Sequence, residues 1–292
     1  MSSLVVQSGQ RLRAGLVAEP AGFWALVVVV LYAAVACGVW LGWWGGDWSA
    51  LAGPGWAGPS ADHWLGTNRL GQDILARALA ATATAFEIGV LVALTTTAIG
   101  GLAGGLAGYS SPGWADEIVL WLMGTLDAIP FYLLVAALAF ALHGHAWAMH
   151  LAMIATFWTT TARLVRAETQ RIRRLPFIEA ARVAGLRPRS IIVRHILPNT
   201  AHILLVQATL VFIAAIKVEV VLSFLGIGTQ DSISWGVMIA EGSQDILAGQ
   251  YGNFVVASLF LFGLVMAFSL LADQLQDSLD PRTRDSRWQP HG

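Results

Sequence analysis

Long apolar stretches separated by shorter polar segments set the pattern of this chain. An α-helix of about 20 apolar residues crosses the roughly 30 Å hydrocarbon core of a bilayer. Six stretches approach or exceed that length, at residues 23–44, 84–109, 117–142, 146–162, 201–224 and 253–271. We therefore predict an all-α polytopic membrane protein with six transmembrane helices and a transmembrane domain that covers residues 23–272.

The second predicted span carries a regular series of glycines. Gly100, Gly104 and Gly108 recur at every fourth residue and so fall on one side of a helix. Small residues at this spacing let the backbone of a second helix approach closely. We interpret the series as a helix-packing surface, with a role in lining a permeation path as the alternative.

Charged and helix-breaking residues inside the predicted spans are candidates for a translocation path. Pro130 predicts a kink in the third span, and Asp127 places a carboxylate three residues before it. Glu219 lies in the fifth span, two residues after Lys217, so these two cannot face each other on one helix. Charged residues in spans usually face a bundle interior or a cavity. Asp127, Pro130 and Glu219 are therefore our translocation-path candidates, with a buried polar contact as an equal alternative for Asp127.

The distribution of charge gives the spans an orientation. Only 12% of the residues are charged, against about 25% in soluble proteins, and 56% are hydrophobic. Residues 163–194 contain nine arginines and two acidic residues, so the positive-inside rule makes this loop cytoplasmic. The predicted cytoplasmic segments are then residues 1–22, 163–200 and 273–292, so both termini are inside. The predicted extracytoplasmic loops are residues 45–82, with a short amphipathic helix at 74–79, and residues 226–252.

The sequence offers little support for a disulfide, a metal site or an ATP-binding loop in this chain. Cys37 is the single cysteine, which excludes an internal disulfide. His143 and His145 share a turn but lack a credible third ligand, so we predict no metal site. Lys217 is the single lysine and is followed by valine, which excludes the phosphate-binding loop Gly-x-x-x-x-Gly-Lys-Ser/Thr. ATP chemistry by that route must come from another chain, and we expect no cofactor in this one.

A short helix is predicted inside the basic cytoplasmic loop. Pro176 suits the first turn of a helix over residues 177–183, which begins with Phe177. Gly185 fits the left-handed position just past the helix end. From composition alone, a surface helix attracted to anionic lipid is an equally good interpretation.

Small and acidic residues on this helix indicate a docking role instead. Ala180 and Ala181 are expected to form a small-residue face, so that the helix can sit deep in a partner's groove. Glu179 places a carboxylate beside that face, where it can accept charge-assisted hydrogen bonds from a partner's arginine or lysine.

The spacing of these residues resembles a known signature. Glu179-Ala180-Ala181, then Gly185, then an element ending in Leu197-Pro198 resembles the cytoplasmic coupling loop of ABC importer permeases. Further segments are similar to the C-type permease subunit of dipeptide, oligopeptide and nickel importers, namely residues 63–68, 70–77, 129–130, 222–228 and 234–236. The resemblance covers nearly the whole chain, although Lys217 is unusual for the family and Asp127 has no clear counterpart.

The resemblance implies a type I ABC importer permease fold and a set of partners. The chain would form the pore with a B-type permease subunit, and two ATPase subunits would bind ATP and Mg²⁺. An extracytoplasmic binding protein would deliver the peptide substrate. The chain itself would lie in the bacterial cytoplasmic membrane, in contact with lipid. The chain itself would be no enzyme, whereas the assembled complex would hydrolyse ATP. The residues expected to couple to the ATPases are Pro176, Phe177, Glu179, Ala180, Ala181, Gly185, His195, Leu197 and Pro198.

Three other functions stay open at this point. A nickel chelate or another small peptide-like solute is the alternative substrate. A self-sufficient secondary transporter is a remote alternative, because it would be expected to show internal repeats and paired charges within the membrane. A membrane scaffold or receptor without transport is the third. Nucleic acid is not expected as a partner of any of them.

Overall fold

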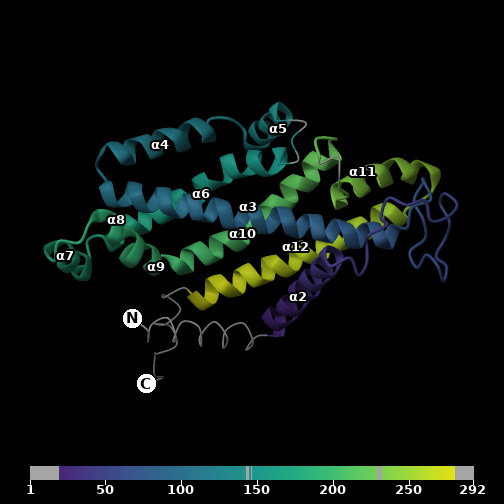
Figure 1. Cartoon of the computed structure of the whole chain (residues 1–292), viewed down its shortest axis with the longest axis horizontal. Coiled ribbons are helices and arrows are strands. Elements are labelled where there is room, and N and C mark those ends of the chain that lie inside the picture. The colour runs from purple at the N-terminus through teal and green to yellow at the C-terminus, as the bar shows by residue number, and fades with distance from the viewer. Residues whose placement is uncertain (1–19, 143–144, 146, 229–231, 280–292) are drawn as a thin grey trace, which may run out of the picture. The chain divides into compact units, whose positions relative to one another are not determined.

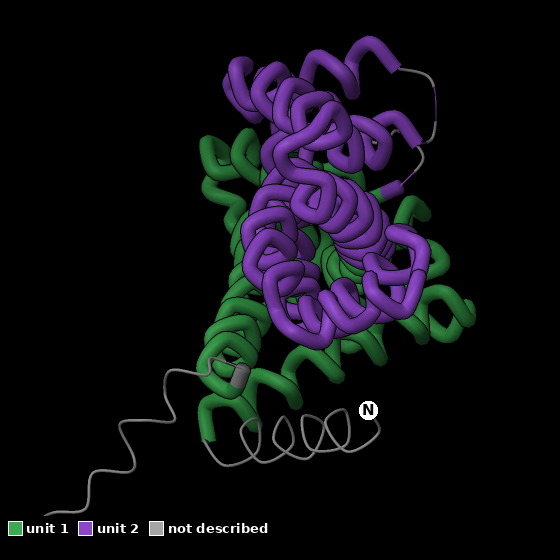
Figure 2. Tube along the Cα trace, turned by 90° about the vertical axis from the view of Figure 1, so that its left-hand side faces the viewer, with its two compact units in different colours: residues 1–86, 233–292 green, residues 87–232 purple. Residues whose placement is uncertain are grey.

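A computed structural model describes residues 20–142, 145, 147–228 and 232–279, and Figure 1 shows the whole chain. Most of the predicted segment 1–22, part of the predicted tail 273–292 and His143 lie outside the described residues. Apart from an isolated β-bridge between Thr67 and Asp73, the regular secondary structure of the described part is helical. The chain divides into two compact units, residues 1–86 with 233–292 and residues 87–232 (Figure 2).

The long apolar helices confirm the prediction of an all-α polytopic membrane protein. In the described part of the chain, four helices are long and apolar enough to cross a membrane, namely α2 (Pro20–Trp40), α3 (Ile74–Ser110), α10 (Ala201–Phe224) and α12 (Gly252–Leu279). A fifth span results if α4 (Trp114–Asp127) and α5 (Phe131–Ala141) are counted as one broken span. The helix α6 (Ala148–Ile172) lies at the fourth predicted span, but its threonines and arginines make it more polar. The count of six spans stays a prediction.

Shorter helices fill the predicted loops. They are α7 (Pro176–Val183), α8 (Pro188–Ile191), the π-helix η1 (Ile192–Ile196), α9 (Leu197–Asn199), α11 (Trp235–Asp245) and the 3-10 helix η2 (Ile246–Ala248). The first four lie in the predicted cytoplasmic loop, and the last two lie in the predicted extracytoplasmic loop 226–252.

The helix α3 begins earlier than predicted. Residues 74–79 are the first turns of α3 instead of a separate short helix. The side chain of Asp73 caps this start, because its Oδ1 accepts a hydrogen bond from the Ala76 amide at 2.8 Å. Alanines follow without a helix breaker, so the helix continues into the apolar segment.

In the first unit, α12 packs against both α2 and α11. The Tyr32 hydroxyl on α2 donates a hydrogen bond to the Phe260 carbonyl at 2.9 Å. Trp235, at the start of α11, is fully buried and donates from its Nε1 to the Ala78 carbonyl at 3.2 Å. Such polar contacts between apolar helices help to fix the register of the packed helices.

In the second unit, α3 meets α6 along the glycine series. A Cβ built at Gly100, Gly104 or Gly108 would lie 2.6, 2.4 and 2.5 Å, respectively, from the nearest atom of α6. Atoms of real side chains do not approach that closely, so the three positions admit only glycine at this backbone separation. Close backbone approach of this kind is how small residues hold membrane helices together.

A sharp bend separates α4 from α5. The axes of the two helices differ by 91° across the break between Asp127 and Phe131, which contains Pro130. Proline lacks an N–H donor and clashes with the preceding turn, so a helix cannot continue through it undisturbed. The kink predicted at Pro130 is therefore a complete break in the helix.

A hydrogen-bonded loop precedes α3 in the first unit. The His63 Nδ1 lies 2.9 Å from the Asp73 Oδ2, and the His63 Nε2 lies 3.2 Å from the Ala52 carbonyl. Asp73 thus caps α3 with one carboxylate oxygen and binds His63 with the other. The hydrogen bond to Asp73 raises the pKa of the His63 imidazole, since it favours the charged form.

We predict that Gly104→Ala destabilises the second unit by about 1–3 kcal/mol, because the new methyl group would overlap the Ala162 carbonyl. Gly124→Ala on α4 is the matched control, because a Cβ there has no atom within 4 Å. The measurement is the unfolding midpoint of each purified variant. Equal midpoints for the two variants would contradict the packing role.

We predict that the loop around His63 loosens as pH rises. A raised pKa in the folded state means that the His63–Asp73 bond contributes fully below the ordinary histidine pKa of about 6.5. That contribution is lost as pH rises through the raised value. Amide hydrogen exchange at residues 63–76, corrected for its intrinsic pH dependence, measures the effect. His63→Gln should abolish the trend, and an unchanged trend in this variant would refute the assignment.

Candidate functional site

The helix α7 is delimited by its own sequence. Pro176 occupies its first turn, where the missing N–H would be unpaired in any case. At the other end, Gly185 has a φ of +77°, the left-handed conformation that glycine adopts most easily. The Leu186 amide donates to the Ala181 carbonyl at 3.2 Å, and the Gly185 amide donates to the Arg182 carbonyl at 2.9 Å. This pair of bonds is a Schellman motif, which closes the helix after two turns.

One side of α7 is buried in an apolar cluster. Ile178 is fully buried and Ala181 nearly so. They pack with isoleucines from the ends of α6, α8 and η1, which we call the isoleucine seat: Ile172, Ile191, Ile192 and Ile196. Full burial of one such side chain is worth about 1.5–3 kcal/mol. The seat therefore holds α7 in a defined orientation.

The opposite side of α7 is exposed. Glu179 and Ala180 are both exposed, as is Phe177, and Val183 is 90% exposed. Ala181 lies on the buried side, so the two adjacent alanines do not form the single exposed face expected from the sequence. The exposed surface instead combines one carboxylate, one small residue and two apolar side chains.

Tyr109, at the end of α3, links α7 to the long helices. It packs against the isoleucine seat, and the Arg182 guanidinium carbon lies 5.0 Å from the centre of its ring. The Arg182 Nε also donates to the Tyr109 hydroxyl at 3.3 Å, and Arg173 donates to the Tyr109 carbonyl at 3.1 Å. A cation–π contact and two hydrogen bonds thus tie the predicted cytoplasmic segment to α3.

The second part of the predicted coupling signature lies beside the seat. His195 is half-buried in η1, and its carbonyl accepts a hydrogen bond from the Asn199 side chain at 2.5 Å. Leu197 packs against the isoleucine seat, whereas Pro198 is exposed. A Cβ at Gly105 on α3 would lie 3.5 Å from Leu197, so the Leu197 side chain lies close to α3. The structure therefore brings both parts of the signature onto one cluster.

The translocation-path candidates occupy two different places. Asp127 and Pro130 line a cavity of about 310 Å³ at the break between α4 and α5. Glu219 is not among the residues that line this cavity; it is buried in α10 and accepts a hydrogen bond from the Ser223 hydroxyl at 2.6 Å. Lys217 is exposed on the same helix.

Two ion pairs that the sequence did not predict join α4 to α6. Arg163 binds Asp127, and Arg166 binds Asp116 in a bidentate pair with distances of 2.5 and 2.8 Å. The sequence analysis used these two arginines only as part of the positive charge that makes the loop cytoplasmic. Two acidic residues at or within one predicted span and two arginines just after the next could have suggested ion pairs between the two helices. This signal is weak, because the sequence does not show which residues face each other.

The described part of the chain offers no ligand set around His145. Among the described residues, no three histidine, cysteine or acidic side chains gather where they could hold a metal ion. His145 is exposed, and its predicted neighbour His143 lies outside the described residues.

Comparison with known proteins identifies relatives over most of the chain. It is 39% identical over 244 residues to the oligopeptide transport system permease protein OppC of Mycobacterium tuberculosis H37Rv, covering 82% of each chain. It is 37% identical to the dipeptide transport system permease protein DppC of Bacillus subtilis 168, covering 77% of this chain and 71% of the relative. It is also 37% identical to the glutathione transport system permease protein GsiD of Pectobacterium atrosepticum, covering 78% and 75%.

A family model agrees with these relatives. Residues 100–285 match the model of the binding-protein-dependent transport system inner membrane component. This range includes α7, the isoleucine seat, the glycine series and the break between α4 and α5. The chain therefore belongs to the family of binding-protein-dependent transport system inner membrane components, and it is a multi-pass transport subunit of the bacterial cytoplasmic membrane rather than an enzyme.

Proposed function

We propose that this chain is the C-type, pore-forming permease subunit of an ATP-driven peptide importer. In this proposal the chain crosses the membrane six times with both termini in the cytoplasm. A B-type permease subunit completes the pore, and an extracytoplasmic binding protein delivers the peptide. Two ATPase subunits bind ATP and Mg²⁺, because this chain lacks the lysine-containing phosphate loop.

The observation that carries the proposal is the two-sided character of α7. Its buried side is fixed to the ends of α6 and α8 through Ile178 and Ala181. Its exposed side offers Phe177, Glu179 and Val183 to a partner. A helix that is fixed on one side and available on the other can transmit a displacement from an ATPase subunit to the membrane helices.

The chemistry of the exposed side suits docking into a cytoplasmic protein. Phe177 and Val183 supply apolar contacts that would be buried in a groove of the ATPase subunit. Glu179 would accept charge-assisted hydrogen bonds from arginine or lysine in that groove. Exposed arginines flank the helix at positions 174 and 187 and would contact acidic groups of the same partner or anionic lipid headgroups.

The substrate assignment rests on the relatives. Their names concern transport of oligopeptides, dipeptides and glutathione, all of which are peptides. A peptide substrate is therefore better supported than the nickel chelate that the sequence left as an alternative. Selection among peptides would be shared with the binding protein, which is a separate chain.

We predict that Glu179→Lys lowers ATP-dependent peptide uptake by about tenfold or more, since hydrogen bonds to charged groups contribute roughly 1.5–3 kcal/mol. Glu179 is exposed and lies outside the isoleucine seat, so the unfolding midpoint should not change. Uptake of a labelled tripeptide into proteoliposomes that contain the assembled transporter measures the effect. Co-purification of the ATPase subunits shows whether docking is lost.

Glu117→Lys is the matched control, because it reverses the charge of another exposed carboxylate that lies on a different helix, α4. It should leave uptake and co-purification near wild-type levels. Normal uptake and normal co-purification in Glu179→Lys would show that α7 is not the docking element.

A further inference from the structure

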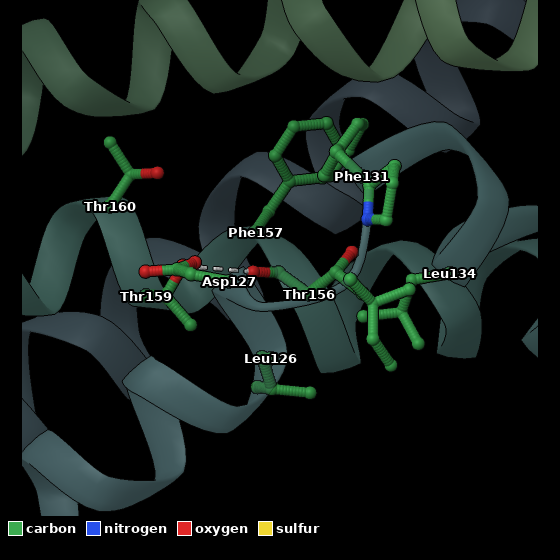
Figure 3. Close-up of a pocket in the computed structure, with 10 residues that line it drawn as sticks. Leu126, Asp127, Phe131, Leu134, Thr156, Phe157, Thr159 and Thr160 are labelled. Carbon is green, nitrogen blue, oxygen red and sulfur yellow. Dashed lines mark hydrogen bonds between the residues drawn. The ribbon is translucent and has the colours of Figure 1, made fainter.

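The cavity at the break between α4 and α5 has one polar side and one aromatic side. Figure 3 shows Asp127 next to Thr159, and Phe131 next to Phe157. The Thr159 hydroxyl donates to the Asp127 Oδ1 at 3.4 Å, and the two phenylalanine ring centres are 4.9 Å apart. The exposed side chain of Thr160 completes the polar side. A carboxylate, hydroxyls and aromatic rings together suit a ligand with both charged and apolar groups.

The Asp127–Arg163 pair differs from the other ion pair between the same helices. The side chains of Asp116 and Arg166 are only 6% and 22% exposed, as expected for a pair that fixes two helices. Those of Asp127 and Arg163 are 43% and 62% exposed, although Asp127 ends the first half of an apolar broken span. An exposed ion pair adds little stability, and charges within membrane spans are usually functional.

The open pair leaves most of the Arg163 guanidinium available. One of its nitrogens, Nη2, donates to the Asp127 Oδ2, whereas a guanidinium carries five N–H donors. The planar arrangement of these donors matches a carboxylate in a two-bond fork. The cavity volume of about 310 Å³ lies at the lower end of the range for small-molecule pockets, which suits the end of a peptide better than a whole oligopeptide.

Arg163 is not among the residues that line the cavity, but it pairs with the lining residue Asp127 and so lies at the cavity's edge. We propose that this cavity receives the C-terminal carboxylate of a peptide in transit, with Arg163 as its anchor. The proposal rests on the peptide-import function argued above. The carboxylate would bind the Arg163 guanidinium, and the terminal side chain would lie against Phe131 and Phe157. Asp127 competes with the peptide carboxylate for the Arg163 guanidinium, so the return of Asp127 to Arg163 releases the peptide. Such competition keeps binding weak enough for release, which a transport path requires.

The test compares two tripeptides in proteoliposomes that contain the assembled transporter, its binding protein and ATP. The probes are alanyl-phenylalanyl-alanine and its C-terminal amide, which lacks the carboxylate. The quantity of interest is the ratio of their initial uptake rates. Any preference of the binding protein enters this ratio equally for every variant, so a change between variants reports on the permease.

We predict opposite effects from the two members of the pair. Arg163→Gln should lower the ratio of free to amidated peptide by about tenfold, since a charge-assisted bond is lost. Asp127→Asn should raise the ratio, because the competing carboxylate is gone. Arg171→Gln should leave the ratio unchanged, since Arg171 pairs with Glu168 further along α6, at 2.9 Å. A role limited to holding α4 against α6 would lower both uptake rates together without changing the ratio.

A double variant guards against the possibility that a single variant fails to fold because it leaves an unpaired charge. The double variant Asp127→Asn/Arg163→Gln keeps a hydrogen-bonding pair without an unpaired charge, and it should show the lowered ratio. If this variant and both single variants kept the wild-type ratio, the proposed carboxylate site would be overturned, whereas the peptide-import function would stand. Absence of ATP-dependent uptake of either peptide by the wild-type transporter would overturn the peptide-import function and the site with it.

Discussion

Burial of Ile178 in the isoleucine seat is the contact on which the rest of the structure depends. The helix α7 has two turns and would be marginal in isolation, since short helices gain little from their own hydrogen bonds. Packing against Ile172, Ile191 and Ile196 gives it a fixed position. Tyr109 extends the same cluster to α3. A displacement of α7 is therefore passed to α3 and α6 instead of being absorbed by a loose loop.

The packing of the long helices continues this rigid connection. At Gly104 the backbone of α3 lies so close to α6 that even a methyl group would collide with it. The Asp116–Arg166 pair then fixes α4 to α6 near the same end. Rigidity ends at Pro130, where α4 and α5 separate at 91° and leave the cavity beside Asp127. The second unit thus combines a stiff part that connects to α7 with an open part that bears charged groups.

Local features of this architecture could be read from the sequence, and tertiary ones could not. Pro176 and Gly185 act through their own backbone preferences, so the ends of α7 were predictable. The inward position of Ala181 and the pairing of Arg163 with Asp127 depend on which residues other segments bring nearby. The early start of α3 depends on a cap from Asp73, which a hydropathy pattern does not register. The peptide substrate became assignable only through the relatives.

The distance between α7 and α3 tests the rigid connection most directly. Ala184, directly after α7, and Leu106 on α3 are both exposed in the second unit. Both can carry spin labels as cysteines once Cys37, the single native cysteine, is replaced by serine. Pulsed electron paramagnetic resonance on the assembled transporter gives the distance with and without a non-hydrolysable ATP analogue. We predict one narrow distance distribution that keeps its centre in both states. A shift of about 5 Å, the pitch of one helical turn, or a second population would contradict the account, because α7 would then move independently of the helices that it is held to drive.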